Sequence, residues 1–154
     1  MHYELDPIAK AAADFIRQFD WNWWCTLSFE HPPTFTKAAA RFNHWVNWLN
    51  RKTFGHFYYK RPGQGLRWVR GVELQQREAI HFHALVAGNP RPSIPEASER
   101  WHDNNKIEPY DSSRKAAEYM VKEYAAEGNL DFGGVWHSSS QLSGLIESCA
   151  RFTG

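Results

Sequence analysis

His81 and His83 are separated by one residue in the run 79–86, whose alternation is typical of a half-buried β-strand. Because side chains alternate across a strand, both imidazoles should lie on one face of a sheet. Glu73 lies eight residues before His81, in a second strand-like run at 66–75. If the two runs pair as a hairpin, Glu73 comes to lie beside the histidines. Two imidazoles and a carboxylate form a donor set for a divalent metal, and Mn²⁺ or Mg²⁺ suits a site that acts on phosphate oxygens.

Tyr119 and Lys122 lie three residues apart in a segment with helical periodicity. At 100° per residue the two side chains are about 60° apart, and the apolar residues of the segment fall on another face. That apolar stripe comprises Ala117, Met120, Val121 and Tyr124. A phenol has a pKa of about 10, and a neighbouring ammonium favours its ionised, nucleophilic form. A metal site, a tyrosine and a lysine together predict cleavage of a phosphodiester through a covalent protein–DNA link.

The elements that must position these residues alternate between strands and helices, which indicates an α+β fold around an antiparallel sheet. Strands are predicted at 22–29, 66–75 and 78–86, with an edge strand at 106–110 because it contains Pro109. Helices are predicted from Asp6 to Phe19, from Thr34 or Thr36 to Lys52, at 95–103, and from Asp111 or Ser112 to Glu127. Residues 54–60 are expected to be short and extended, and no element is assigned after Leu130.

The chain length of 154 residues predicts one domain, 1–154, and the net charge of +1 excludes a basic tail that binds nucleic acid nonspecifically. Contacts to DNA phosphates would have to come from local groups, for which Lys60, Arg61, Arg67 and Arg70 are candidates; the alternative is a solvated basic hairpin. Aromatic residues make up 16% of the chain. Trp21, Trp23 and Trp24 could stack on bases, although packing in the core is the favoured interpretation.

The two cysteines, Cys25 and Cys149, have no metal-binding spacing and predict a reduced protein with free thiols. The chain begins without the features of a signal peptide, and no apolar run approaches the roughly 20 residues that span a bilayer. We therefore expect a cytoplasmic protein of a bacterial or archaeal host cell, with no membrane partner.

In chain order, Trp24–Phe29, Glu73, His81-Phe82-His83 and Tyr119 with Lys122 resemble the motifs of HUH endonucleases. The closest subgroup is the rolling-circle replication initiator (Rep) proteins of plasmids and small phages, and the resemblance spans about 21–127. It implies a ferredoxin-like or RRM-like five-stranded antiparallel sheet flanked by helices, with the histidines on a central strand. It also implies Glu73, His81 and His83 as ligands of Mn²⁺ or Mg²⁺, Tyr119 as nucleophile and Lys122 as its assisting lysine.

The resemblance implies site-specific nicking and joining of single-stranded DNA at an origin, or at an origin hairpin, through a 5′-phosphotyrosine. Glu123 stands where two-tyrosine relatives place their second tyrosine, which favours a single nucleophile. No helicase region follows in this sequence, so a host helicase and polymerase are expected partners.

Three alternatives remain open at this point. A single-tyrosine HUH transposase uses similar groups, although Lys122 argues mildly against it. A two-histidine, one-carboxylate Fe(II) oxygenase would use the same ligands but would give Tyr119 no role. A noncatalytic nucleic-acid-binding sheet domain would use the aromatic residues for base stacking alone.

Overall fold

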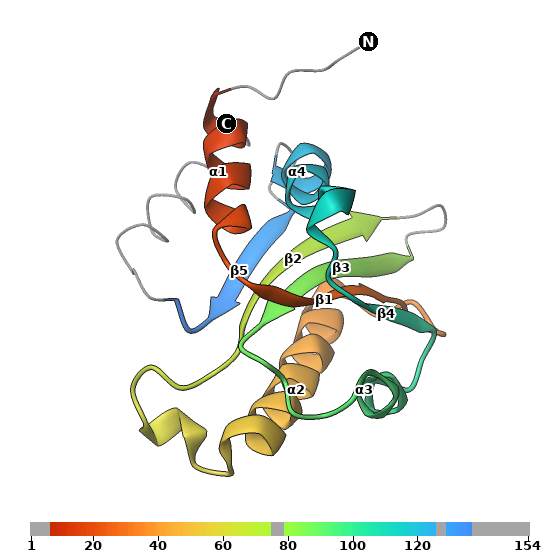
Figure 1. Cartoon of the computed structure of the whole chain (residues 1–154). Helices are drawn as coiled ribbons and strands as arrows, with labels where there is room; N and C mark the ends of the chain where they lie inside the picture. The colour runs from red at the N-terminus through yellow and green to blue at the C-terminus, as the bar shows by residue number, and fades with distance from the viewer. Residues whose placement is uncertain (1–6, 75–78, 126–128, 137–154) are drawn as a thin grey trace.

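The computed structural model describes residues 7–74, 79–125 and 129–136 (Figure 1). Five strands form one antiparallel sheet in the order β4-β1-β3-β2-β5. They are β1 (Trp21–Leu27), β2 (Arg67–Leu74), β3 (Ile80–Ala87), β4 (Asn105–Pro109) and β5 (Leu130–Gly134). The α+β fold and the five-stranded antiparallel sheet are confirmed. So are the central position of the strand that carries His81 and His83 and the edge position of the strand that contains Pro109.

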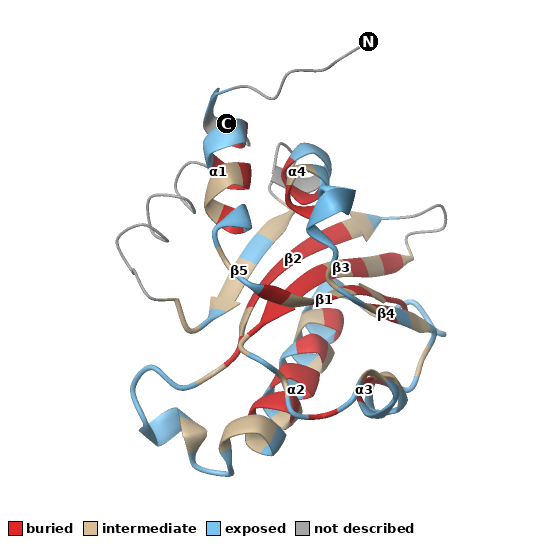
Figure 2. Ribbon diagram, viewed as in Figure 1, coloured by how far each residue is buried: buried red, intermediate tan, exposed pale blue. Residues whose placement is uncertain are grey.

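Helices cover both faces of the sheet. Figure 1 shows α1 (Pro7–Arg17) and α4 (Ala116–Met120) on one side and α2 (Phe35–Phe54) and α3 (Ile94–Trp101) on the other. Buried side chains form two apolar clusters, one under each pair of helices, and the central strands are buried on both faces (Figure 2). The sheet therefore has an α4 face and an α2 face, and these names are used below.

The alternation of β1 divides its residues between the two faces. Trp23, Cys25 and Leu27 are buried in the cluster under α2, whereas Trp24 and Thr26 are half-buried on the opposite face. The same period places Val69 and Leu85 in the cluster under α1 and α4. Strand β3 reaches that cluster at its carboxyl end, and His81 and His83 lie on the same face nearer its start. The α4 face thus changes along β3 from polar to apolar.

Local capping explains where two of the helices begin. Thr34 is the N-cap of α2 and its hydroxyl accepts a hydrogen bond from the backbone N–H of Lys37 at 3.3 Å. Ser93 and Glu96 form a reciprocal capping box at the start of α3. Of the two caps predicted for the long helix, Thr34 is the one that the structure uses.

The prediction of one continuous helix after Asp111 was wrong. The Asp111 carboxylate accepts hydrogen bonds from the N–H and hydroxyl of Ser113, which favours a tight 3₁₀ turn at Ser112–Arg114. Lys115 then adopts a left-handed conformation with φ of 55°, and α4 begins at the next residue. After Met120 the backbone continues as a π-helix, Val121–Ala125. Tyr119 therefore lies on a short helix with irregular backbone on both sides.

Two further segments differ from the sequence prediction. Residues 58–60, expected to be extended, form a 3₁₀ turn, η1 (Tyr58–Lys60). The segment left unassigned after Leu130 forms β5, which pairs with β2. Gly134 at its end has φ of 84°, and a Cβ there would overlap the carbonyl oxygen of Leu66.

Several expectations fall outside the described residues: the Gln76-Arg77 loop, the helix end at Glu127 and Cys149. Cys25 is buried with a free thiol, and burial raises its pKa far above the usual range. No helix within the described ranges is long and apolar enough to cross a membrane.

Candidate functional site

Strands β2 and β3 pair so that Glu73 stands directly opposite His81, and Gly71 opposite His83. This register places Glu73, His81 and His83 on the α4 face, as the hairpin prediction required. The Nε2 atom of His83 is 2.9 Å from the Oε2 atom of Glu73, so the carboxylate and one imidazole are in direct contact. The carboxylate of Glu73 is therefore placed to orient the His83 ring.

Strand β1 supplies a hydroxyl to each histidine. The Thr26 hydroxyl is 3.4 Å from Nδ1 of His83, and the Ser28 hydroxyl is 3.4 Å from Nδ1 of His81. Sequence reasoning did not single out these two residues. Their signal was present as the alternation of Trp24, Thr26 and Ser28, which puts all three on the face that carries the histidines.

Burial lowers the pKa of His81, and this effect exceeds the opposing influence of the Glu73 carboxylate; the neighbouring His83 lowers the pKa further. The imidazole of His81 is therefore held in its neutral form, which is the form that binds a metal. Ring position and chemistry agree on this point, since two imidazoles and a carboxylate share one face.

The three predicted ligands are brought onto one face but are only partly drawn together. Within the described part of the chain, no three His, Cys, Asp or Glu side chains converge closely enough to hold a metal ion. Glu73 and His83 touch, whereas His81 directs Nδ1 to Ser28. The donor types fit a divalent cation, and the side-chain arrangement shows a carboxylate–imidazole pair with a second imidazole two residues away.

Tyr119 packs against the histidine side of this site. Its ring centroid is 6.2 Å from that of His83 and 6.1 Å from that of Trp24, with interplanar angles of 80° and 83°. The Trp24 ring stacks on His83 at 5.7 Å and 20°. Tyr119 is nevertheless 41% exposed, so its hydroxyl end remains accessible while its ring is held. The structure thus brings together the predicted nucleophile and a predicted ligand that are 36 residues apart in sequence.

A cavity of about 380 Å³ opens beside this cluster. It lies between β4, the turn that follows β4 and the start of α4, and its lining residues are Trp24, His83, Glu108, Pro109, Tyr110, Asp111, Arg114, Ala116 and Tyr119. The Arg114 side chain is 66% exposed and lies 3.5 Å from the Glu108 carboxylate. Aromatic walls and an exposed cation at the rim suit a nucleotide better than an apolar ligand.

Residues 22–128 match a family model of replication-associated proteins of the ORF2 type. The chain belongs to this family. The match runs from β1 past the π-helix and includes Glu73, His81, His83 and Tyr119. Membership confirms the resemblance to replication initiators and connects the protein with DNA replication, which the oxygenase alternative does not explain.

Among solved structures, the crystal structure of the hypothetical protein ORF119 from Sulfolobus islandicus rod-shaped virus 1 is similar to this replication-associated protein. The TM-score is 0.43 at 16% sequence identity, over 73% of this chain and 90% of that chain. The search of curated proteins finds no match.

Lys122, the predicted assisting residue, is exposed in the π-helix of this replication-associated protein. The offset of about 60° from Tyr119 assumed a regular α-helix, and the π-helix changes the turn between them. The side chain of Tyr124 lies outside the described part of the structure.

The four basic residues proposed as phosphate contacts do not gather around this site. Arg70 is 3% exposed on the α2 face and binds the Asp131 carboxylate at 2.6 Å, so the prediction of a phosphate contact for Arg70 was wrong. Arg67 is half-buried, with its guanidinium 4.9 Å from the Phe19 ring. Lys60 and Arg61 are exposed, but they precede the end of β2 that lies away from Glu73.

The three early tryptophans of the replication-associated protein have two different roles. Trp21 and Trp23 are 6% and 7% exposed, which confirms core packing for both. Trp24 is half-buried and belongs to the candidate site through its contacts with His83 and Tyr119.

Proposed function

We propose that this replication-associated protein nicks and rejoins single-stranded DNA at an origin through a covalent phosphotyrosine intermediate. The observation that carries the proposal is the contact between Tyr119 and His83, with ring centroids 6.2 Å apart beside an open cavity. A tyrosine held against a histidine–carboxylate pair is the arrangement that covalent cleavage of a phosphodiester needs.

In the proposed step, the Tyr119 oxygen attacks the scissile phosphorus and forms a new P–O bond. The bond from phosphorus to the 3′ oxygen of the preceding nucleotide breaks, which leaves a 5′-phosphotyrosine and a free 3′-OH. The phenol loses its proton and the departing 3′ oxygen takes one up. Attack by a 3′-OH on the phosphotyrosine reverses the reaction and rejoins the strand. The free 3′-OH can serve a polymerase, with a separate helicase to open the duplex.

Residues of this chain have distinct duties in the proposal. Trp24 holds the Tyr119 and His83 rings at fixed angles, which orients the phenol toward the cavity. The exposed ammonium of Lys122 would stabilise negative charge on the phosphate. Because Glu123 occupies the place of a second tyrosine, one nucleophile performs both halves of the reaction.

Glu73, His81 and His83 would hold the Mn²⁺ or Mg²⁺ ion. When bound, such an ion supplies Lewis-acid polarisation of the scissile phosphate. The shared face of the three donors, the Glu73–His83 contact and the neutral state of His81 support this assignment. It predicts that Mn²⁺ raises the melting temperature of the protein and that His81→Ala removes the shift, a readout independent of activity.

The decisive experiment incubates the protein with a randomised pool of single-stranded DNA and Mn²⁺ or Mg²⁺, then separates the products on a denaturing gel. We expect a covalent protein–DNA band that EDTA abolishes and Tyr119→Phe removes. Tyr110→Phe is the matched control, because it deletes a hydroxyl from the wall of the same cavity and should retain the band. A band that persists in Tyr119→Phe would refute the assignment of the nucleophile.

The partial convergence of the three ligands favours one second candidate, a noncatalytic domain that binds nucleic acid on the same surface. That function predicts DNA binding that EDTA and His81→Ala leave unchanged, with no covalent band. A single-tyrosine transposase would share the chemistry proposed above and would differ in its DNA, so transposon-end sequences recovered from the pool would identify it.

A further inference from the structure

Positive charge is distributed unevenly along this chain. Residues 31–72 contain eight lysines and arginines and no aspartate or glutamate, whereas the rest of the chain carries ten basic and seventeen acidic residues. The small net charge of +1 therefore conceals a strongly basic segment. In the fold this segment forms α2, η1 and most of β2, so the basic residues gather on one part of the molecule.

The turn after α2 exposes aromatic side chains within that segment. Phe57 and Tyr59 are 54% and 65% exposed, and their ring centroids are 6.4 Å apart. The Lys60 ammonium lies 4.8 Å from the Phe57 ring. We call Phe57, Tyr59, Lys60 and Arg61 the η1 surface. Exposed aromatic rings beside cations have no role in a monomer's core and are the combination that binds single-stranded nucleic acid.

The backbone that presents the η1 surface is anchored to α2. Gly55 has φ of 99°, and its N–H bonds to the carbonyl of Arg51 at the end of the helix. The Arg61 guanidinium bonds to the carbonyl of Phe54, and the Tyr58 hydroxyl donates to the side-chain oxygen of Asn47 at 3.1 Å. These bonds fix the turn while the outer rings remain exposed, so binding requires little ordering of the loop.

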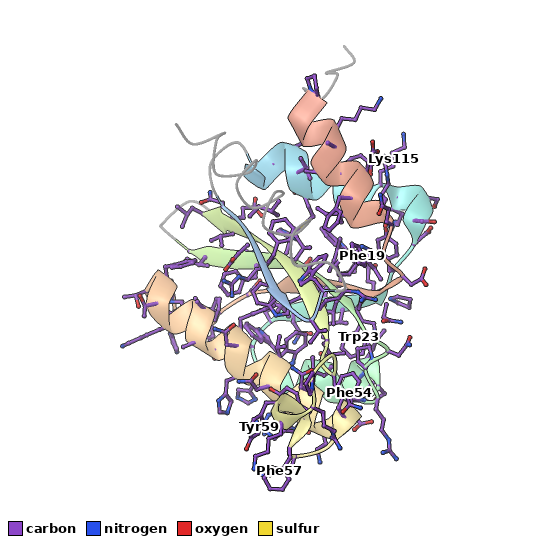
Figure 3. The ribbon with its side chains drawn as sticks, turned by 90° about the vertical axis from the view of Figure 1, so that its left-hand side faces the viewer. Phe19, Trp23, Phe54, Phe57, Tyr59 and Lys115 are labelled. Carbon is purple, nitrogen blue, oxygen red and sulfur yellow. The ribbon has the colours of Figure 1, made fainter. Side chains whose placement is uncertain are left out.

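The η1 surface is remote from the candidate active site. Figure 3 shows Phe57 and Tyr59 at the opposite end of the molecule from Lys115, which immediately precedes α4, and Figure 2 shows the same turn as largely exposed. Along β2 alone, the distance from Arg67 to Glu73 is about 20 Å. One short oligonucleotide therefore cannot be counted as occupying both places.

We propose that the η1 surface is a second binding site for single-stranded DNA, separate from the Tyr119 site. Bases stack on Phe57 and Tyr59, and Lys60 and Arg61 contact the phosphates. The absence of any acidic residue across residues 31–72 favours a polyanion over a protein partner. The proposal does not depend on nicking, because stacking and phosphate contacts need neither the metal nor the nucleophile.

The test measures fluorescence anisotropy of a labelled oligothymidine of roughly 16 nucleotides, the upper end of the site size of a small single-strand-binding fold. Binding is measured in EDTA with the full chain carrying Tyr119→Phe, so that no covalent product forms. Loss of one stacked base corresponds to an affinity lower by about 5- to 150-fold. We expect a loss in this range for Phe57→Ala with Tyr59→Ala, and retained affinity for Tyr59→Trp.

Phe35→Ala is the matched control, because Phe35 is 52% exposed and begins the same helix at its other end. It should bind like the parent. Lys60→Gln should reduce the slope of log affinity against log salt by about 0.7. Affinity of the double variant within twofold of the parent would overturn the proposal, as would an equal loss in Phe35→Ala. A η1 variant that binds weakly but still forms the covalent band on short DNA separates this proposal from the proposed nickase activity.

Discussion

Replacing Asp131 with alanine tests the position of Arg70, because the side chain of Arg70 is 3% exposed and has its ion pair with Asp131 at 2.6 Å. The guanidinium also lies 4.8 to 4.9 Å from the rings of Phe42, Trp68 and Phe82. Its Nε and Nη1 atoms have no hydrogen-bond partner in the described structure. Burial lowers the pKa of Arg70 and Asp131 opposes this, so the carboxylate is the main polar support of a charge held among aromatic rings.

The size of the effect follows from this asymmetric burial. Removing one partner of a fully buried pair costs about 3–5 kcal/mol, but the Asp131 side chain is 57% exposed and water screens its contribution. A hydrogen bond to a charged group is worth about 1.5–3 kcal/mol, and we expect about 2 kcal/mol for Asp131→Ala. At about 2–4 °C per kcal/mol for a domain of this size, the melting temperature should fall by about 4–8 °C.

Thermal and urea unfolding of Asp131→Ala, Arg70→Met and the double variant would measure the coupling. Met keeps an unbranched apolar stem among the three rings and removes the charge, so the loss caused by Asp131→Ala should disappear in the Arg70→Met background. The salt dependence of DNA binding should be unchanged in Arg70→Met. An Asp131→Ala loss of equal size in both backgrounds, or a salt slope lowered by about 1 in Arg70→Met, would refute the core assignment.

Three further outcomes are expected. Trp24→Leu removes two ring contacts worth about 0.5–1.5 kcal/mol each, so single-turnover formation of the covalent band should slow by about 5- to 150-fold; an unchanged rate would contradict its positioning role. Gly134→Ala should lower the melting temperature by at least about 2 °C in a thermal scan, because φ is 84° and the new Cβ overlaps the Leu66 carbonyl. Hydrogen bonds from Arg41 and the Glu30 N–H lower the pKa of Asp103, so its stabilisation is present above the unfolded pKa of about 3.9 and lost as pH falls through the folded pKa. Asp103→Asn should therefore melt below the parent at pH 7, and the difference should close below about pH 4.

Features that depend on short stretches of sequence were predictable. The alternation in β1, β2 and β3 is visible in the residues themselves, and it fixes which side chains share a face. The pairing of Glu73 with His81 follows from that alternation once the two strands form a hairpin. Pro109 placed β4 at an edge because it cannot donate a ladder hydrogen bond, and the capping hydroxyl of Thr34 marked the start of α2.

Features that depend on distant pairing were not predictable from local pattern. Arg70 stands in a strand with residues of both polarities, and period alone does not distinguish a solvated guanidinium from a buried one. Its burial depends on Asp131, which is 61 residues away on a strand that the sequence pattern left unassigned. Likewise, Lys60 and Arg61 lie close to β2 in sequence, but the direction of that strand carries the predicted metal ligands away from them.

The region around Tyr119 shows why local rules fail where the candidate chemistry lies. A continuous helix would satisfy its own backbone and would need neither the left-handed Lys115 nor the π-helix. Instead, Ala117, Met120 and Val121 are anchored in the core while Tyr119 projects from a five-residue helix toward His83 and Trp24. Left-handed non-glycine residues and π-turns carry a local cost that the surrounding packing must offset, and they concentrate at functional sites. The departure from helical periodicity is therefore itself an argument that the placement of Tyr119, rather than helix stability, governs this segment.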